Sequence, residues 1–221
     1  WEIRNLEITN DTTDASVQRR GVYVVAQDIG VCNYIHLIDL DIHNIKSISN
    51  TPADWNYEGG GIIMLVYANS DPALRVSTKF NDILIQGCNI TNTDKTGIFI
   101  RNKAWKNRGP LTDGVGPWNG FTNVVIRNNI LDNIGGDGIV TCECNAPLVE
   151  YNVARDTHKR ATNPCVAMWP INCDDALYQY NEAYLTRTTI DGEGFDCDGC
   201  SNRTIMQYNY SHDNEGGFML I

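Results

Sequence analysis

Two carboxylates stand before glycines at matching points of the sequence. Asp137 precedes Gly138-Ile139 and Glu193 precedes Gly194-Phe195, where a polar turn gives way to an apolar run. If these runs stack two coils apart, their backbones lie about 9.6 Å apart, and side chains that lean together can admit a water molecule. An acid and a base held in this way can hydrolyse a glycosidic bond. We therefore predict Asp137 and Glu193 as an acid/base pair.

The second carboxylate lies within a dense acidic cluster. We expect Phe195 to face inward, so strand alternation directs Asp196 and Asp198 outward. Crowding raises the pKa of at least one carboxyl group, which places an acid beside a base, so we predict that Asp196 and Asp198 support catalysis. Two alternatives stay open. Asp before Gly is common in turns, and crowded acids can hold Ca²⁺, here through Asp191, Glu193, Asp196 and Asp198. The catalytic interpretation requires no cofactor.

One histidine follows the acidic cluster. His212 lies in the segment Ser211-His212-Asp213-Asn214-Glu215. A histidine beside carboxylates can act as a general base or a proton shuttle, and we include His212 among the candidate catalytic residues. The alternative is a solvated histidine in a polar turn.

Aromatic side chains gather in two long segments without periodicity. Residues 48–58 carry Trp55 and Tyr57, and residues 103–120 carry Trp105 and Trp118. Long loops in an otherwise regular fold are often functional, and flat aromatic rings with polar edges suit stacking on sugars. We predict that Trp55, Tyr57, Trp105 and Trp118 bind substrate. Alternatively, the tryptophans only hold their loops against the fold.

A repeated phrase indicates which elements position these residues. A short β run, an Asn, a polar turn and a Gly before a second apolar run recur, aligned on Asn89, Asn129, Asn152, Asn181 and Asn209. The spacings of 40, 23, 29 and 28 residues are typical of solenoid coils with loops of variable length. Each unit must stack on its neighbours to bury its apolar face, and the Asn side chains can form a ladder. The sequence predicts an all-β parallel β-helix, one domain over residues 1–221, within a longer solenoid.

The cysteines test the coil register. Stacking Ile139, Val166 and Phe195 places Cys144, Cys173 and Cys200 above one another, with a two-residue bulge before Cys173. Adjacent rungs lie about 4.8 Å apart, which suits a disulfide, whereas two rungs do not. In an oxidising compartment we expect Cys173 to bridge to Cys144 or to Cys200, and Cys144 not to reach Cys200.

Composition excludes some partners. The net charge is −10, and no basic stripe is present, which argues against nucleic acid. No run of about 18 apolar residues occurs, so no membrane span is expected. A neutral polysaccharide or oligosaccharide stays possible, and the sequence does not indicate an oligomeric state.

The phrases NVVIRNNILDNIGGDGI and TIMQYNYSHDNEGGFML resemble right-handed parallel β-helix proteins of the pectate-lyase-like superfamily. This resemblance implies a secreted, extracellular or cell-surface protein that acts on carbohydrate along the outer face of one sheet. Our leading hypothesis is a glycoside hydrolase that uses paired carboxylates. One alternative is a Ca²⁺-dependent polysaccharide lyase with Lys159, Arg160 or His212 as base. The other is a β-helical adhesin or structural module without activity.

Overall fold

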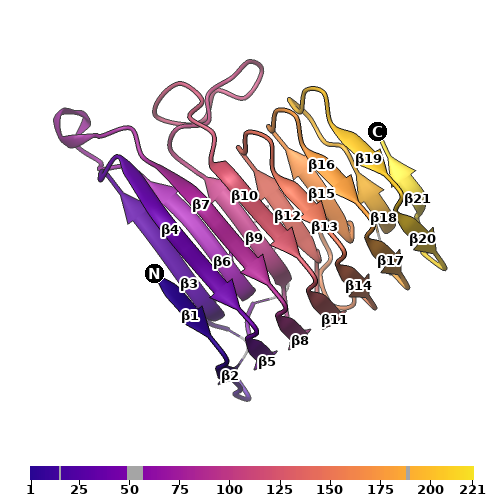
Figure 1. Ribbon diagram of the computed structural model, residues 1–221. Helices are drawn as coiled ribbons and strands as arrows, with labels where there is room; N and C mark the ends of the chain where they lie inside the picture. Colours follow the sequence, from indigo (N-terminus) through magenta and orange to yellow (C-terminus); the bar gives the residue numbers. More distant parts are fainter. Residues whose placement is uncertain (15, 49–56, 188–189) are drawn as a thin grey trace.

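The protein is a parallel β-helix, described by a computed structural model for residues 1–14, 16–48, 57–187 and 190–221. Three parallel sheets of seven strands each run the length of the molecule (Figure 1). The chain passes through the three sheets in turn and moves up one rung with each coil. The predicted fold class is therefore confirmed. Within the described residues the single helix is a 3₁₀ turn, η1 (Pro72–Leu74).

Every strand pairs with the strand one coil before and one coil after it. The first sheet contains, in spatial order, β1 (Glu2–Arg4), β4 (Val31–Ile38), β7 (Lys79–Gln86), β10 (Thr122–Arg127), β13 (Leu148–Glu150), β16 (Leu177–Gln179) and β19 (Ile205–Gln207). The second contains β2 (Glu7–Asn10), β5 (Asp41–Ile45), β8 (Asn89–Thr93), β11 (Ile130–Ile134), β14 (Val153–Arg155), β17 (Glu182–Tyr184) and β20 (Tyr210–His212). The third contains β3 (Arg20–Gln27), β6 (Gly60–Tyr67), β9 (Thr96–Asn102), β12 (Ile139–Cys142), β15 (Met168–Ile171), β18 (Glu193–Asp196) and β21 (Gly217–Leu220).

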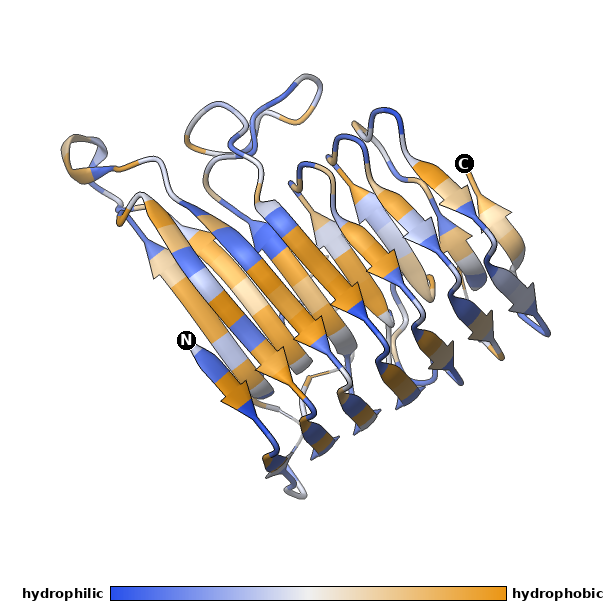
Figure 2. Ribbon diagram, viewed as in Figure 1, coloured by the Kyte–Doolittle hydropathy of each residue, from blue (hydrophilic) through white to orange (hydrophobic). Residues whose placement is uncertain are grey.

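Apolar side chains fill the interior between the sheets. On the third sheet, the inward row passes through Ile98, Ile139, Met168 and Phe195, all of them buried. Hydrophobic residues lie along the strands, and hydrophilic ones gather at the turns (Figure 2). Full burial of such a side chain contributes about 1.5–3 kcal/mol, so the stack stabilises the coil strongly. A Cβ on Gly138 would lie 2.4 Å from the carbonyl oxygen of Ala167 on the next rung, which explains a glycine at the start of this strand.

The predicted Asn ladder is present on four of its five positions. The side-chain oxygens of Asn152, Asn181 and Asn209 each accept hydrogen bonds of 2.9–3.1 Å from the backbone and side-chain nitrogens of the preceding Asn. Asn89 is not part of the ladder, because Cys88 occupies that position and donates its backbone N–H to Asn129. Asn89 instead faces solvent, and its amide donates to Asp41. The prediction was one residue out in this coil because a cysteine stands at the ladder position and an asparagine follows it.

The register links Ile139 to Phe195 as predicted, but through Met168 rather than Val166. Cys144 and Cys173 then stack on adjacent rungs without a bulge, and the Cys144 N–H lies 3.3 Å from the Cys173 sulfur. Cys200 does not join them, because Ser201 holds that place, and its Oγ lies 3.5 Å from the Cys173 nitrogen. All eight cysteines fall within the described residues, and all are free thiols. The structure therefore contains no disulfide among them.

No helix in the part of the chain that the structure describes is long and apolar enough to cross a membrane.

Candidate functional site

The candidate site lies on the outer face of the third sheet, across strands β9, β12, β15 and β18. Strand alternation directs every second side chain outward, and parallel pairing aligns these side chains in rows. One row contains Phe99, Val140, Trp169 and Asp196. The next row, two residues farther along each strand, contains Arg101, Cys142, Ile171 and Asp198. Phe195 packs inside, as the sequence predicts, so Asp196 and Asp198 point outward.

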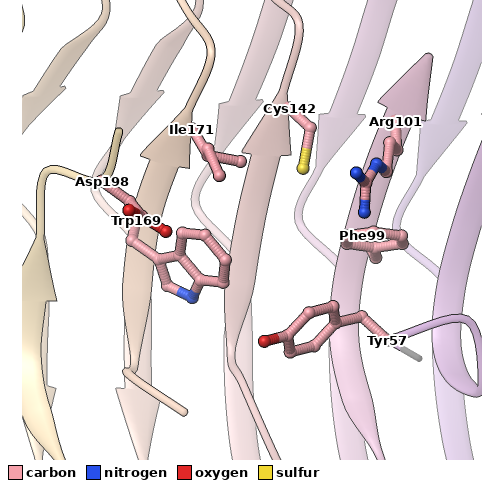
Figure 3. A pocket seen from close by; sticks show the side chains of 7 residues that line it. All are labelled: Tyr57, Phe99, Arg101, Cys142, Trp169, Ile171 and Asp198. Carbon is pink, nitrogen blue, oxygen red and sulfur yellow. The ribbon is translucent and has the colours of Figure 1, made fainter. Parts of the chain in front are cut away.

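A cavity of about 250 Å³ opens on these rows. Figure 3 shows its lining, with Arg101 beside Phe99 at one side, Asp198 beside Trp169 at the other, and Tyr57 below them. The Tyr57 ring lies 5.9 Å from Trp169 in an edge-on arrangement and 5.6 Å from Phe99. Burial raises the pKa of the Tyr57 phenol, so the hydroxyl stays protonated. Aromatic rings with tilted faces form a rigid apolar wall with polar edges, which suits a sugar.

A second, smaller cavity of about 30 Å³ adjoins the first and shares Tyr57, Trp169 and Asp198 with it. Four carboxylates line this smaller cavity: Asp137, Asp191, Asp196 and Asp198. They come from two coils, since Asp137 precedes β12 and the other three lie in or beside β18. Asp198 alone among these carboxylates lines both cavities. The two cavities together place carboxyl groups at one end of an aromatic pocket.

Asp137 is fully buried beneath the pocket. Its Oδ1 accepts a hydrogen bond of 2.7 Å from the Trp169 indole and one of 3.0 Å from the Val166 N–H, while Oδ2 has no partner. Burial raises the pKa of Asp137 because the carboxylate loses its water, although the two hydrogen bonds oppose that rise. This geometry lets Asp137 fix the orientation of Trp169.

Glu193 is in register with Asp137, two rungs away, as the sequence predicts. Its side chain is 9% exposed, and Oε2 has no hydrogen-bond partner in the structure. Glu193 contributes to the lining of neither cavity described above. The stacking of the two carboxylates is therefore correct, whereas their joint role as an acid/base pair stays a prediction.

Asp191, Asp196 and Asp198 differ in their exposure and charge. Burial and the nearby Asp198 raise the pKa of Asp196 to about 7, and Asp196 is 8% exposed. Burial also raises the pKa of Asp191, which is half-buried, although the nearby His158 opposes that rise. Asp198 is exposed. The cluster therefore combines Asp196, whose pKa lies near neutrality, with Asp198, which is accessible to solvent.

His212 lies away from this site. It is on β20 of the second sheet, where its ring stacks between Tyr184 and Tyr210 at 4.7 and 4.3 Å. Its Nδ1 lies 2.7 Å from Asp213 and its Nε2 lies 3.1 Å from Glu182, and these hydrogen bonds raise its pKa. The structure therefore does not bring His212 to the acidic cluster. His212 is close to the acidic cluster in sequence, but the cluster lies on the third sheet and His212 on the second.

Of the four aromatic residues predicted to bind substrate, the structure places one in the pocket. Tyr57 reaches the pocket, but Trp105 and Trp118 line neither cavity, and Trp55 lies outside the described residues. Trp105 covers Gly116 and Trp118 covers Gly120, each within their own loop. The Trp118 indole also donates a 2.9 Å hydrogen bond to the Asn172 carbonyl. This packing matches the alternative in which the tryptophans hold the loop, and a role in sugar binding stays a prediction.

The bases considered for a lyase lie in a turn outside both cavities. Lys159 pairs with Asp156, while Arg160 contacts Asp94 at 3.1 Å and donates to Asn133. Within the described part of the chain, no group of three or more His, Cys, Asp or Glu side chains is arranged to hold a metal ion. The set Asp191, Glu193, Asp196 and Asp198 is therefore not assembled as a Ca²⁺ site in this structure.

Sequence reasoning missed the residues that form most of the pocket: Phe99, Arg101, Cys142, Trp169 and Ile171. These residues lie within strands rather than loops. The available signal was strand alternation, which places Trp169 and Asp196 on the same face once the register through Met168 is known.

Comparison with known proteins points to glycoside hydrolases. No family model matches the chain. The chain is 27% identical to a lacto-N-biosidase of Bifidobacterium longum subsp. longum, over 99% of its own length and 17% of that protein. Its fold is similar to two crystal structures of the GH136 lacto-N-biosidase from Eubacterium ramulus, native and selenomethionine, with TM-scores of 0.83 and 0.80 at 27% and 28% identity. These alignments cover 98% of this chain and 38% of those chains. The chain thus spans less than half the length of proteins that are lacto-N-biosidases.

Proposed function

We propose that this chain forms the catalytic region of a glycoside hydrolase that acts on oligosaccharides and releases lacto-N-biose from them. The observation that carries this proposal is the placement of Asp191, Asp196 and Asp198 at one end of an aromatic pocket. The similarity to lacto-N-biosidases over nearly the whole chain supports both the reaction and the sugar.

Glycoside hydrolysis needs one carboxylic acid that protonates the leaving oxygen and a second carboxylate that attacks or activates water. Asp198 takes the second role, because it is exposed and lines both cavities. Asp191 takes the first role, because burial raises its pKa while its half-exposed side chain still reaches the cavity. The proton lost by Asp191 goes to the oxygen of the leaving sugar.

The remaining acids support this pair. Asp196 is 8% exposed and has a pKa of about 7, so it stays largely protonated below neutrality and limits the repulsion around Asp198. Asp137 holds the Trp169 indole through a 2.7 Å hydrogen bond. Trp169 and Tyr57 then form the wall against which a sugar ring stacks and from which water is excluded. In this assignment Asp137 is a positioning residue.

The proposal requires no cofactor, since the carboxyl groups supply both the acid and the base. An oligosaccharide substrate is compatible with a chain of net charge −10 if the sugar is neutral. We also propose an extracellular or cell-surface location, because such a substrate is met outside the cell.

The decisive experiment incubates the protein with a neutral oligosaccharide that ends in lacto-N-biose and identifies the products by chromatography. Release of the saturated disaccharide supports the hydrolase. An unsaturated sugar with ultraviolet absorbance would indicate a lyase instead, and dependence on added Ca²⁺ after chelation would agree with that. Absence of any product across a wider panel of glycans would favour a structural module.

A further inference from the structure

Arg101 is a cation at the far end of the pocket from the acids. It projects from β9 beside Phe99 into the cavity (Figure 3). Its Nε is buried and has no hydrogen-bond partner, and no ion pair within 4.0 Å joins its side chain to another described residue. The buried Nε is closed to a ligand, but the guanidinium lines the cavity, so a ligand oxygen there can accept a hydrogen bond from the accessible end of this charged donor.

The neighbouring carboxylate does not take up this donor. Glu143 accepts hydrogen bonds from the Asn102 N–H at 3.0 Å and from the Asn172 amide at 3.2 Å. Its carboxyl oxygens are thus directed away to other donors, and burial raises its pKa to about 7. Arg101 lowers that pKa from a distance without forming a contact. The guanidinium therefore keeps hydrogen-bonding capacity for a molecule in the cavity.

The register sets the length of the pocket between Arg101 and Asp198. The two residues occupy the same outward row, with Cys142 and Ile171 between them. Three strand spacings of about 4.8 Å separate their backbones by about 14 Å. The floor between them is apolar, with Phe99 and Trp169 in the adjacent row. A ligand that touches both ends needs a body of about two sugar rings and polar groups at each end.

We propose that Arg101 donates hydrogen bonds to the hydroxyl oxygens of the outermost sugar of the released disaccharide and so makes the enzyme prefer a disaccharide to a single sugar. This inference rests on the proposed function for the position of the cleaved bond. The outermost sugar is neutral. Asp191, Asp196 and Asp198 at the other end, with Glu143 beside Arg101, oppose an anionic ligand.

The test measures binding, so that it does not depend on turnover. Calorimetry compares lacto-N-biose with each of its two component sugars, using the wild-type protein and Arg101→Met, which keeps a long side chain but removes the donors. A hydrogen bond from a charged donor accounts for about tenfold to 100-fold in affinity, and that loss is expected for the disaccharide alone. Arg101→Lys, which keeps one donor group, should recover part of it.

Arg203→Met is the matched control, because Arg203 is an exposed guanidinium paired with Asp175 away from the pocket. Arg203→Met should leave the affinities for lacto-N-biose and for both component sugars unchanged. Equal losses for the disaccharide and for the inner sugar, or no loss in Arg101→Met, would overturn the inference. So would tighter binding of a disaccharide that carries a carboxylate, or no binding of lacto-N-biose by the wild-type protein.

A hydrolysis assay on the same proteins separates the two proposals. If binding follows the expected pattern and no glycoside is cleaved, the role of Arg101 stands and the hydrolase assignment fails. If cleavage occurs but Arg101→Met affects the disaccharide no more than the inner sugar, the hydrolase stands and the role of Arg101 fails.

Discussion

Two aromatic groups of this molecule use the same coil stacking in opposite ways. Tyr151, Tyr180 and Tyr208 lie in successive turns, with ring centres 5.0 and 5.1 Å apart and planes within 7° of parallel. Their faces cover one another, although the side chains are exposed. Tyr57, Phe99 and Trp169 are buried, but their rings are tilted by 40° and 75°. Tilt leaves ring faces free for a ligand, whereas parallel stacking occupies them with neighbouring coils.

The two groups also differ in their surroundings, because the pocket rings adjoin Asp191, Asp196 and Asp198, whereas the three tyrosines line none of the cavities described for this part of the chain. The largest expected effect is therefore on catalysis. Asp198→Asn keeps the shape and removes the charge of an exposed residue, so turnover should fall by about 10²–10⁴ with the unfolding temperature unchanged. Asp132→Asn, which removes a surface carboxylate paired with Arg155 on the second sheet, is the control. The measurement is kcat on a neutral oligosaccharide.

The same assay decides between the two carboxylate pairs. If Asp191 and Asp198 react with the sugar, Asp191→Asn should also lower kcat by about 10²–10⁴. Glu193→Gln should then have a much smaller effect, since Glu193 lines neither cavity. A loss in Glu193→Gln as large as that in Asp198→Asn, with folding intact, would restore Glu193 to the chemistry and refute the present assignment.

The next effect concerns the rings themselves. Trp169→Ala should weaken disaccharide binding by about tenfold or more, because the sugar loses its stacking surface and the pocket admits water. Tyr180→Ala removes the middle of the tyrosine stack and should leave binding unchanged, with a cost to stability of about 1 kcal/mol. Comparable losses of affinity in both variants would show that the tyrosine stack also contacts the glycan.

A smaller effect is expected beneath the pocket. Asp137→Leu removes the acceptor of the Trp169 indole and should lower both the affinity and the unfolding temperature, because a buried N–H loses its partner at a cost of about 1–3 kcal/mol. Asp137→Asn keeps an acceptor oxygen and should retain most of the affinity. If Asp137→Asn instead abolishes turnover while affinity is normal, Asp137 has a catalytic rather than a positioning role.

The last effect is on stability as a function of pH and leaves sugar binding aside. The pKa of Asp196 is raised from 3.8 to about 7, so the folded state binds more protons than the unfolded state between these values. Stability from this group is present at low pH and is lost as pH rises from about 4 to 7. Asp196→Asn should remove this dependence, which corresponds to a change in Tm on the order of 10 °C across the window. Glu143, whose pKa is also about 7, makes stability fall with rising pH in the same direction. The contribution of Asp196 is therefore the difference in this pH dependence between the wild-type protein and Asp196→Asn.

Much of the fold was predictable from sequence, because coil stacking repeats a simple signal. Asn129, Asn152, Asn181 and Asn209 each recur at the same point of a coil, and the placement of Ile139 and Phe195 in one row follows from the Gly that precedes each. Errors arose where one residue could shift the frame. Cys88 replaced Asn89 in the ladder, and Ser201 replaced Cys200 above Cys173.

The site was harder to predict than the fold. Asp196, Asp198 and Tyr57 were among the candidates, and the structure brings them together with Trp169, which was not. An apolar residue in a strand can face the core or a ligand, and sequence alternation alone does not separate the two cases at Phe99 or Ile171. The approach of Tyr57 to Trp169 joins segments far apart in sequence, which no local pattern encodes.

The Asn ladder also has a direction. Each amide oxygen accepts from the coil before it, so every coil from Asn129 onward presents the same acceptor to its predecessor and the same donors to its successor. A coil is thus an interchangeable module. Duplication or deletion of one whole turn between Asn152 and Asn209 recreates the same ladder hydrogen bonds, whereas loss of a single residue within a strand exchanges the inward and outward faces of that strand. The ladder therefore allows the length to change in steps of one coil while its own hydrogen bonds stay the same.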